Sequence, residues 1–393
     1  MKTPSRSIVV LSAASFFSMM GMSIVSPVIP DYALSFGVPF ALAGLLISGF
    51  GLARLLVDLP AGMLSQRFGA RRFMLLGLAI IALSSLIAGF ALNYTVLLVA
   101  RVLEGAGSAI YMTTSLTAVT RLSPKESRGV NLSLYMSMFL IGTMIGPVVG
   151  GLAAEHFGLG APFTVYGLFA SLSFLLVWKT IHPEEVAHAS GAIRPRELFG
   201  LLRSYDILTI NLANICIFVA RQGILNTMVP LYARLNLGLA LSELGVILSI
   251  AALANLVTML LSGSMSDRYG RRPFFLAGLG LTAFFIALMP FTTDIVQLGA
   301  VVAGLSLSLG LAGPMAAWLT DVVRPGELGG AMALFRTMGD LGYVVGPVAL
   351  AALAGSAGSV SAVPFFLAAA VIFSLTLPLV RTSDPAGSAA RTV

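Results

Sequence analysis

The chain has 393 residues, of which 58% are hydrophobic and 10% are charged, and its formal net charge is +7. A soluble domain carries roughly one quarter charged residues because its surface faces water. This composition therefore excludes a soluble protein and predicts a surface that faces lipid. The basic residues gather between apolar runs, so they indicate one side of a membrane and not nucleic-acid binding.

Apolar runs of about 20 residues recur along the chain, which is the length of an α-helix that crosses a bilayer. The runs are continuously apolar, whereas the strands of a membrane barrel would alternate polar and apolar residues. Run length and polar breaks predict twelve helices, at residues 8–30, 41–64, 73–92, 95–117, 130–154, 161–180, 207–232, 242–264, 273–291, 295–320, 329–354 and 361–380. Basic residues before an apolar run, here Lys2 and Arg6, are also typical of signal peptides. The many spans that follow favour a first helix that is retained in the mature protein. We therefore predict an all-α integral membrane protein.

The basic residues set the expected orientation. With the N-terminus inside, most of the 23 Lys and Arg residues fall on inner segments, and Arg234 is the basic residue of an outer loop. Because cytoplasmic loops carry the excess of Lys and Arg, we expect both termini in the cytoplasm and a multi-pass protein of the cytoplasmic membrane.

The second half of the chain repeats the first. Gly62 and Gly263 lie 201 positions apart, as do Pro124 and Pro325, and a "GP" pair recurs at 146–147 and 346–347. Such repeats build transporters whose two halves rock around a central site. We predict two pseudo-symmetric six-helix bundles, at residues 1–182 and 207–393. Between them, residues 183–206 form a cytoplasmic linker in which alternating apolar and charged residues predict a short helix on the membrane surface.

Charged residues inside the predicted spans are the main candidates for function, since each costs about 2.5–3.5 kcal/mol at a helix centre on insertion scales. Three pairs have helical spacing: Arg54 with Asp58, Arg101 with Glu104, and Arg336 with Asp340. They are either structural pairs that neutralise each other or groups of a polar cavity in which a carboxylate carries protons. The proton-coupling candidates are Asp58, Glu104, Asp340 and Arg101. The candidate cavity residues are Arg54, Arg221, Gln222, Asn226, Asn255, Trp318, Arg336 and Tyr343. Trp318, Tyr343 and Tyr111 could equally serve as packing residues.

Short motifs give the chain a family resemblance. The loops "GMLSQRFGARR" at 62–72 and "GSMSDRYGRRP" at 263–273, the "RVLEGAGSA" of the fourth span and the "GTMIGPVVGG" of the fifth resemble the major facilitator superfamily. The fifth-span motif is similar to that of its 12-helix drug:proton antiporters. The resemblance covers essentially the whole chain.

The resemblance implies a conformational latch at the two loops and flexible packing in the fifth span. The residues concerned are Gly62, Gln66, Arg67, Gly69, Arg71 and Arg72 in the first loop, Asp267, Arg268, Gly270, Arg271 and Arg272 in the second, and Gly142, Gly146, Pro147 and Gly150 in the fifth span. Gly69 and Gly270 permit a tight turn with positive φ. The family pattern has an acid where Gln66 stands, so we expect a weaker latch in the first loop.

The function that the resemblance implies is secondary active transport by alternating access, with small amphiphilic molecules exported in exchange for protons. The predicted spans contain four arginines and three acidic residues, which favours, as an alternative, a transporter whose substrate is an organic or lipid-like anion. A membrane receptor or scaffold that does not transport is the third possibility. We expect no enzyme activity, no metal and no cofactor, with the proton gradient as energy source. The expected partners are a small-molecule substrate, protons and lipid, without nucleic acid, and we expect a monomer.

Overall fold

The computed structural model describes residues 5–124, 127–181, 200–324, 327–355 and 359–384, apart from the side chains at positions 66, 67 and 329. All regular elements in these residues are helices, which confirms the predicted fold class. Contacts divide the chain into an N-terminal unit (residues 1–38, 45–192 and 240–249) and a C-terminal unit (39–44, 193–239 and 250–393). The predicted linker lies largely outside the described residues, so its surface helix and the domain boundaries stay predictions.

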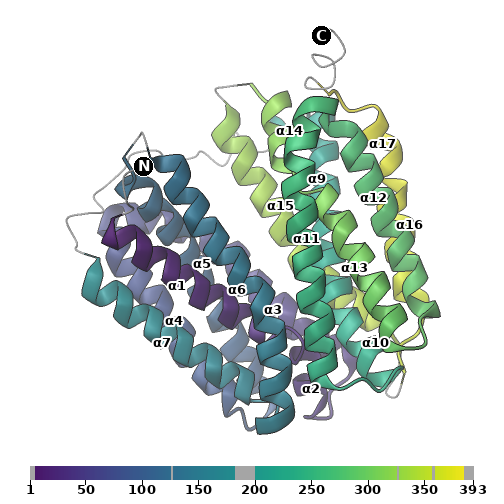
Figure 1. Ribbon diagram of the computed structural model, residues 1–393, viewed down its shortest axis with the longest axis horizontal. Helices are drawn as coiled ribbons and strands as arrows, with labels where there is room; N and C mark the ends of the chain where they lie inside the picture. Colours follow the sequence, from purple (N-terminus) through teal and green to yellow (C-terminus); the bar gives the residue numbers. More distant parts are fainter. Residues whose placement is uncertain (1–4, 125–126, 182–199, 325–326, 356–358, 385–393) are drawn as a thin grey trace. The chain divides into compact units, whose positions relative to one another are not determined.

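The first six predicted spans are present as helices of the N-terminal half. They are α1 (Arg6–Ile24), α2 (Ile29–Leu34), α3 (Phe40–Phe68), α4 (Ala70–Gly89), α5 (Tyr94–Leu122), α6 (Arg128–Phe157) and α7 (Ala161–Thr180) (Figure 1). Helix α1 packs against α6 and α7, while α4 packs against α5 and α7. Phe50, Tyr111, Phe163 and Tyr166 are among the largest side chains that this packing buries.

The C-terminal half repeats this arrangement. Its helices are α9 (Tyr205–Phe218), the π-helix η2 (Val219–Met228), α10 (Val229–Leu235), α11 (Leu241–Tyr269), α12 (Arg271–Leu288), the 3₁₀ turn η3 (Met289–Phe291), α13 (Ile295–Leu311), α14 (Met315–Val322), α15 (Leu328–Leu353), α16 (Val363–Ser374) and α17 (Thr376–Val380). Helix α15 packs against α9 and η2, and α12 packs against α13 and α16. These pairs correspond to α6 on α1, and to α4 on α5 and α7.

Eleven helices of the described chain are long and apolar enough to cross a membrane. The remaining predicted span corresponds to α15, a helix of 26 residues that contains Arg336 and Asp340. Large apolar side chains such as Leu83, Phe284 and Leu367 are exposed on the helices. An exposed apolar surface of this kind is stable in contact with lipid tails and not with water.

Prolines interrupt two of the predicted spans. The first span is α1 followed by the short α2, and the turn between them contains Pro27 while α2 has Pro30 near its start. The tenth span is α13 followed by α14, with Gly313 and Pro314 in the break. Proline lacks the backbone N–H and disfavours helix geometry in the residue before it. The apolar character continues through these prolines, so run length alone did not predict the breaks.

Single glycines form the tight turns at the two motif loops. Gly69 joins α3 to α4 with φ of +94°, and Gly270 joins α11 to α12 with φ of +92°. No side chain restricts these residues to negative φ. The predicted positive-φ turn is therefore present in both halves, and we call the end of each unit that carries it the loop end.

Candidate functional site

Arg101 and Glu104 form an ion pair on α5 inside the N-terminal unit. Their exposed fractions are 2% and 0%, and Ser85 of α4 donates a hydrogen bond of 2.6 Å to Glu104 Oε1. The Arg101 guanidinium also lies 4.6 Å from the centre of the Phe50 ring of α3. Pairing, the serine hydrogen bond and the cation–π contact together offset the desolvation of two buried charges.

The glycines that follow Arg101 let two neighbouring helices approach α5. A Cβ atom on Gly105 would lie 2.3 Å from the carbonyl oxygen of Phe50 in α3. A Cβ atom on Gly107 would lie 2.8 Å from the carbonyl oxygen of Gly77 in α4. Small residues at such crossings allow close backbone contact in membrane proteins. The "RVLEGAGSA" motif thus positions the ion pair between α3, α4 and α5.

Arg54 and Asp58 of α3 both meet α5. Thr113 donates a hydrogen bond of 2.9 Å to Asp58 Oδ1, and Arg54 Nη1 lies 3.8 Å from the sulfur of Met112. Both side chains are half-buried, and within the described residues they form no ion pair with each other. Helical spacing predicts that Arg54 and Asp58 lie on one face of α3. In the structure, the side chains of both residues contact α5. The predicted role of Asp58 in proton coupling stays a prediction.

The two charged residues of α15 differ in burial. Arg336 is exposed, whereas Asp340 and Tyr343 are buried. The buried side of the helix approaches α9 closely, since a Cβ atom on Gly342 would lie 2.4 Å from the carbonyl oxygen of Ile215. The predicted roles of Arg336, Asp340 and Tyr343 in coupling or substrate binding stay predictions.

The polar residues of the seventh span lie in the π-helix η2. Asn226 donates a hydrogen bond of 2.8 Å to the Gln222 side chain, and Thr227 donates one of 2.7 Å to the Gln222 carbonyl oxygen. Gln222 is buried and Arg221 is half-buried. A π-helix inserts an extra residue per turn and occurs often at functional sites. Sequence periodicity did not predict it, because a π-helix of ten residues shifts only a few positions of a continuously apolar pattern.

Asn255 and Trp318 have structural partners in the C-terminal unit. Asn255 donates a hydrogen bond of 3.1 Å to the Ser306 carbonyl oxygen. Trp318 is 0% exposed, lies 5.1 Å from the Phe275 ring and donates to the Ser383 carbonyl oxygen at 2.8 Å. These contacts are those of a packing residue, which is the alternative to a cavity residue that the sequence left open for Trp318.

The second motif loop contains an ion-pair network. Arg271 contacts Asp267 at 2.5 Å and Asp321 of α14 at 3.1 Å, and it donates a hydrogen bond of 2.9 Å to Ser266. The backbone N–H groups of Arg271 and Arg272 donate to the two carboxylate oxygens of Asp384, at 3.1 and 3.2 Å. Asp384 thereby caps the N-terminus of α12, where a negative charge is favourable. We call Asp267, Arg271 and Asp321 the charged triad.

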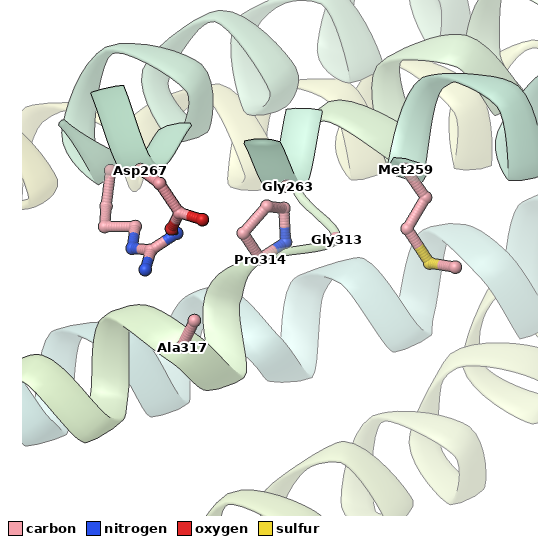
Figure 2. A pocket seen from close by; sticks show the side chains of 7 residues that line it. Met259, Gly263, Asp267, Gly313, Pro314 and Ala317 are labelled. Carbon is pink, nitrogen blue, oxygen red and sulfur yellow. The ribbon is translucent and has the colours of Figure 1, made fainter. Parts of the chain in front are cut away.

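A cavity of about 400 Å³ lies beside the charged triad. Its lining comes from α11, the start of α12, the break between α13 and α14, and α14 itself: Met259, Gly263, Asp267, Arg271, Gly313, Pro314 and Ala317. Figure 2 shows Gly313 and Pro314 between Asp267 and Met259. At the repeat step of 201, Met259 and Pro314 correspond to Asp58 and Thr113. Two residues that line this cavity therefore correspond to the hydrogen-bonded pair Asp58 and Thr113 of the N-terminal unit.

In the first motif loop an arginine binds the end of a neighbouring helix, as in the second loop, but the charged triad is absent. Arg71 donates a hydrogen bond of 2.8 Å to the carbonyl oxygen of Trp178 at the end of α7, as Arg272 does to that of Val380 at the end of α17. Arg72 is exposed, and the side chains of Gln66 and Arg67 lie outside the described residues. At the same step of 201, the positions of Asp267, Arg271 and Asp321 hold Gln66, Ala70 and Thr120. All three charges are absent together, so the departure extends well beyond the glutamine noted in the sequence.

The glycine face of the fifth span packs on α1. Cβ atoms on Gly142, Gly146 and Gly150 of α6 would lie 2.5, 2.0 and 1.8 Å from atoms of Phe16, Ser23 and Ile24. The close helix approach that was expected from the glycine spacing is therefore present inside the N-terminal unit.

Known proteins resemble the chain over most of its length. A multi-drug resistance efflux pump PmrA homolog of Lactococcus lactis is 28% identical over 86% of both chains. An uncharacterized MFS-type transporter of Methanocaldococcus jannaschii is 24% identical over 95% of this chain and 97% of the relative. The synaptic vesicular amine transporter of Rattus norvegicus is 26% identical over 80% of this chain and 62% of that protein.

Solved structures share the fold. A nucleoside transporter, NupG, matches with a TM-score of 0.81 and 13% identity over 96% of this chain and 99% of that chain. A bacterial homolog of the human lysosomal transporter Spinster matches with a TM-score of 0.75 and 17% identity over 100% of this chain and 98% of that chain. The sequence model of the Major Facilitator Superfamily matches residues 11–241 and again residues 210–392. The chain is therefore a transporter and not an enzyme, and it belongs to the Major Facilitator Superfamily.

Proposed function

We propose that the protein exports small amphiphilic molecules in exchange for protons, by alternating access. The observation that carries this proposal is the similarity to a multi-drug resistance efflux pump homolog over 86% of both chains. A match over 86% of the chain includes helices of both halves. In transporters built from two repeated halves, the substrate site lies between helices of the two repeats.

The substrate class that we propose is an amphiphilic amine. One relative is an amine transporter by name, and aliphatic amines are cationic at neutral pH because their pKa lies near 10. Asp58 offers a half-buried carboxylate, and Asp340 a buried one, inside spans of the chain. Such carboxylates attract a cation when ionised and release it when protonated, which is the exchange that a proton-coupled exporter needs.

An organic anion remains the second candidate because of the arginines in the spans. Glu104 neutralises Arg101, which leaves Arg54 and Arg221 as half-buried cations of two different spans. Arginine matches carboxylate and phosphate groups with its planar fork of donors. A receptor without transport is the third outcome of the test below.

The proposal includes the cytoplasmic membrane as location, both termini inside and a monomeric transporter. The excess of basic residues on the proposed inner segments supports this orientation. Accessibility of cysteines placed singly near Arg72 and near Asp294 to an impermeant thiol reagent in intact cells tests it. Labelling near Asp294 alone is expected, and labelling near Arg72 alone would reverse the orientation.

Transport assays in liposomes separate the three candidates. Purified protein is reconstituted, a pH gradient is imposed, and accumulation is followed for an amphiphilic amine, an amphiphilic carboxylate and a neutral dye. We expect accumulation of the amine that disappears when the gradient is collapsed. Accumulation of the carboxylate alone would favour the anion transporter, and binding without accumulation of any probe would favour the receptor. Protein-free liposomes are the control for passive partition.

A further inference from the structure

A stripe of polar side chains runs along the buried face of α5. Arg101, Glu104, Ser108, Tyr111 and Ser115 follow one another at steps of three or four residues, and each is at most 2% exposed. Residues at these steps lie on the same side of a helix. At a rise of 1.5 Å per residue, the stripe is about 21 Å long, which is most of the thickness of a bilayer's apolar core. The ion pair described above is one end of it.

Hydroxyl groups from two other helices face the opposite end of the stripe. Ser18 of α1 and Tyr135 of α6 lie beside the Tyr111 side chain, and Ser15 of α1 lies beside Tyr135. The hydroxyls of Ser115 and Tyr135 are hydrogen-bonded to each other at 2.7 Å. We call Ser15, Ser18, Tyr111, Ser115 and Tyr135 the hydroxyl cluster.

Three hydroxyls of the cluster have no hydrogen-bond partner within 3.5 Å among the described residues. They are those of Ser15, Ser18 and Tyr111, and all three residues are at least 98% buried. A buried hydroxyl without a partner costs about 1–3 kcal/mol in protein mutational data. A single buried hydroxyl without a partner can result from imperfect packing. Three of them on facing helices indicate a polar space between the helices. Buried polar spaces hold water molecules, which supply the missing hydrogen bonds.

The spacing of the stripe also suits water. Residues one turn apart on a helix have Cβ atoms about 5–6 Å apart. A single water molecule bridges about 5.5 Å with two hydrogen bonds of roughly 2.8 Å each. Ser108 lies one turn from Glu104 and one turn from Tyr111, so a hydroxyl is available at each step between the cluster and the carboxylate.

We propose that water molecules in the hydroxyl cluster form, with Ser108, a proton relay between Tyr135 and Glu104. The inference rests on the proposed proton coupling and adds Glu104 to Asp58 and Asp340 as a carboxylate that takes up a proton. Each hydroxyl or water donates a proton toward Glu104 and accepts one from the Tyr135 side, so every hydroxyl ends neutral. The net step removes one proton from hydronium at the Tyr135 end and adds it to the Glu104 carboxylate. Protonation converts Glu104 to a neutral acid and ends its ion pair with Arg101, while Phe50 of α3, Ser85 of α4 and Phe163 of α7 face the pair as uncharged groups.

Removal of hydroxyls tests the relay in reconstituted liposomes. Tyr111→Phe and the double variant Ser15→Ala, Ser18→Ala delete the proposed water sites with little change in shape. The control is Tyr32→Phe, which removes a buried tyrosine hydroxyl that donates to the Ala88 carbonyl oxygen away from the stripe. Two rates are measured with an amphiphilic amine dye: accumulation driven by a pH gradient, and exchange of labelled for unlabelled dye without a gradient.

The relay predicts that both cluster variants lose gradient-driven accumulation by about tenfold or more, on the order of 1.4 kcal/mol of barrier, while exchange stays within about twofold. Tyr32→Phe should change neither rate by more than that. Full gradient-driven accumulation in the cluster variants overturns the relay, and so does an equal loss of both rates, which indicates a structural defect. Exchange without any proton flux in the wild-type protein would instead end the proposed coupling itself.

Discussion

Arg271 Nη1 lies 2.5 Å from Asp267 Oδ1, across the glycine turn that joins α11 to α12. The first half of the chain has Ala70 and Gln66 at these positions. The two motif loops thus share a turn and an arginine that binds a helix end, but the C-terminal unit alone has the charged triad among the described residues. We infer that the loop end of the C-terminal unit is held more rigidly than that of the N-terminal unit.

Arg271→Gln should lower the thermal stability of the protein. The variant loses its contacts with Asp267, Asp321 and Ser266 at once. Asp267 is 62% exposed, so solvent screens part of the interaction, and we expect a loss of about 1–2 kcal/mol. The unfolding temperature in detergent measures it. Arg268→Gln removes the same charge from an exposed residue of the same loop and should leave the temperature nearly unchanged. Equal losses in the two variants would show that net charge and not the triad matters.

Asp384→Ala should destabilise the start of α12. The Asp384 carboxylate accepts hydrogen bonds from the backbone of Arg271 and Arg272, and loss of a cap costs about 0.5–2 kcal/mol. Hydrogen exchange of residues 271–274, followed by mass spectrometry, should become faster. Asp384→Asn keeps an acceptor oxygen and should have a smaller effect. Unchanged exchange in Asp384→Ala would mean that water caps the helix equally well.

Gly150→Ala should prevent correct packing of α6 on α1. Its Cβ atom would lie 1.8 Å from the Ile24 carbonyl oxygen, a backbone atom that cannot rotate away. We expect a loss of several kcal/mol, in the range of overpacked cores or above, seen as a much lower yield of folded protein in size-exclusion chromatography. Gly280→Ala is the matched control, because nothing lies within 4 Å of its Cβ position. It should be neutral or stabilising by up to about 1 kcal/mol.

Replacing one partner of the buried ion pair should harm the protein more than replacing both. Glu104→Met leaves the Arg101 charge buried without a carboxylate, which costs about 3–5 kcal/mol. In the double variant Arg101→Met, Glu104→Met no charge is left to desolvate, so its unfolding temperature should exceed that of either single variant. If the losses of the single variants simply add in the double variant, the pair is not energetically coupled.

The sequence predicted the number and type of the helices well, since run length alone determines which segments can span a bilayer. Residues 41–64 and 95–117 were predicted, and α3 and α5 extend beyond them by up to about a turn at each loop end. Helical hydrogen bonding continues into polar residues, until Gly69 ends α3 and Ser123, before Pro124, ends α5. The hydropathy pattern, in contrast, ends with the apolar run. The repeat at 201 residues likewise predicted the matching packing of the two halves.

The side-chain partners were harder to predict. Helical spacing placed Arg101 beside Glu104, and the pair is formed, because both belong to one helix. The partner of Asp58 is Thr113, which lies 55 positions away and becomes a neighbour only when α3 packs on α5. Ser15, Ser18 and Tyr111, whose hydroxyls have no hydrogen-bond partner among the described residues, are ordinary polar residues in the sequence. Only burial on facing helices distinguishes them.

The most direct test of the account is the internal pH of liposomes that contain the transporter, followed as an amphiphilic amine is added. Wild-type protein should move protons against the amine, whereas Asp58→Asn or Asp340→Asn should retain amine exchange and lose at least about nine-tenths of the proton movement, a tenfold effect. Asp294→Asn is the control, because Asp294 caps α13 in an exposed position and asparagine caps equally well. Full proton movement in both variants, or amine transport by the wild-type protein without any proton movement, would contradict the account.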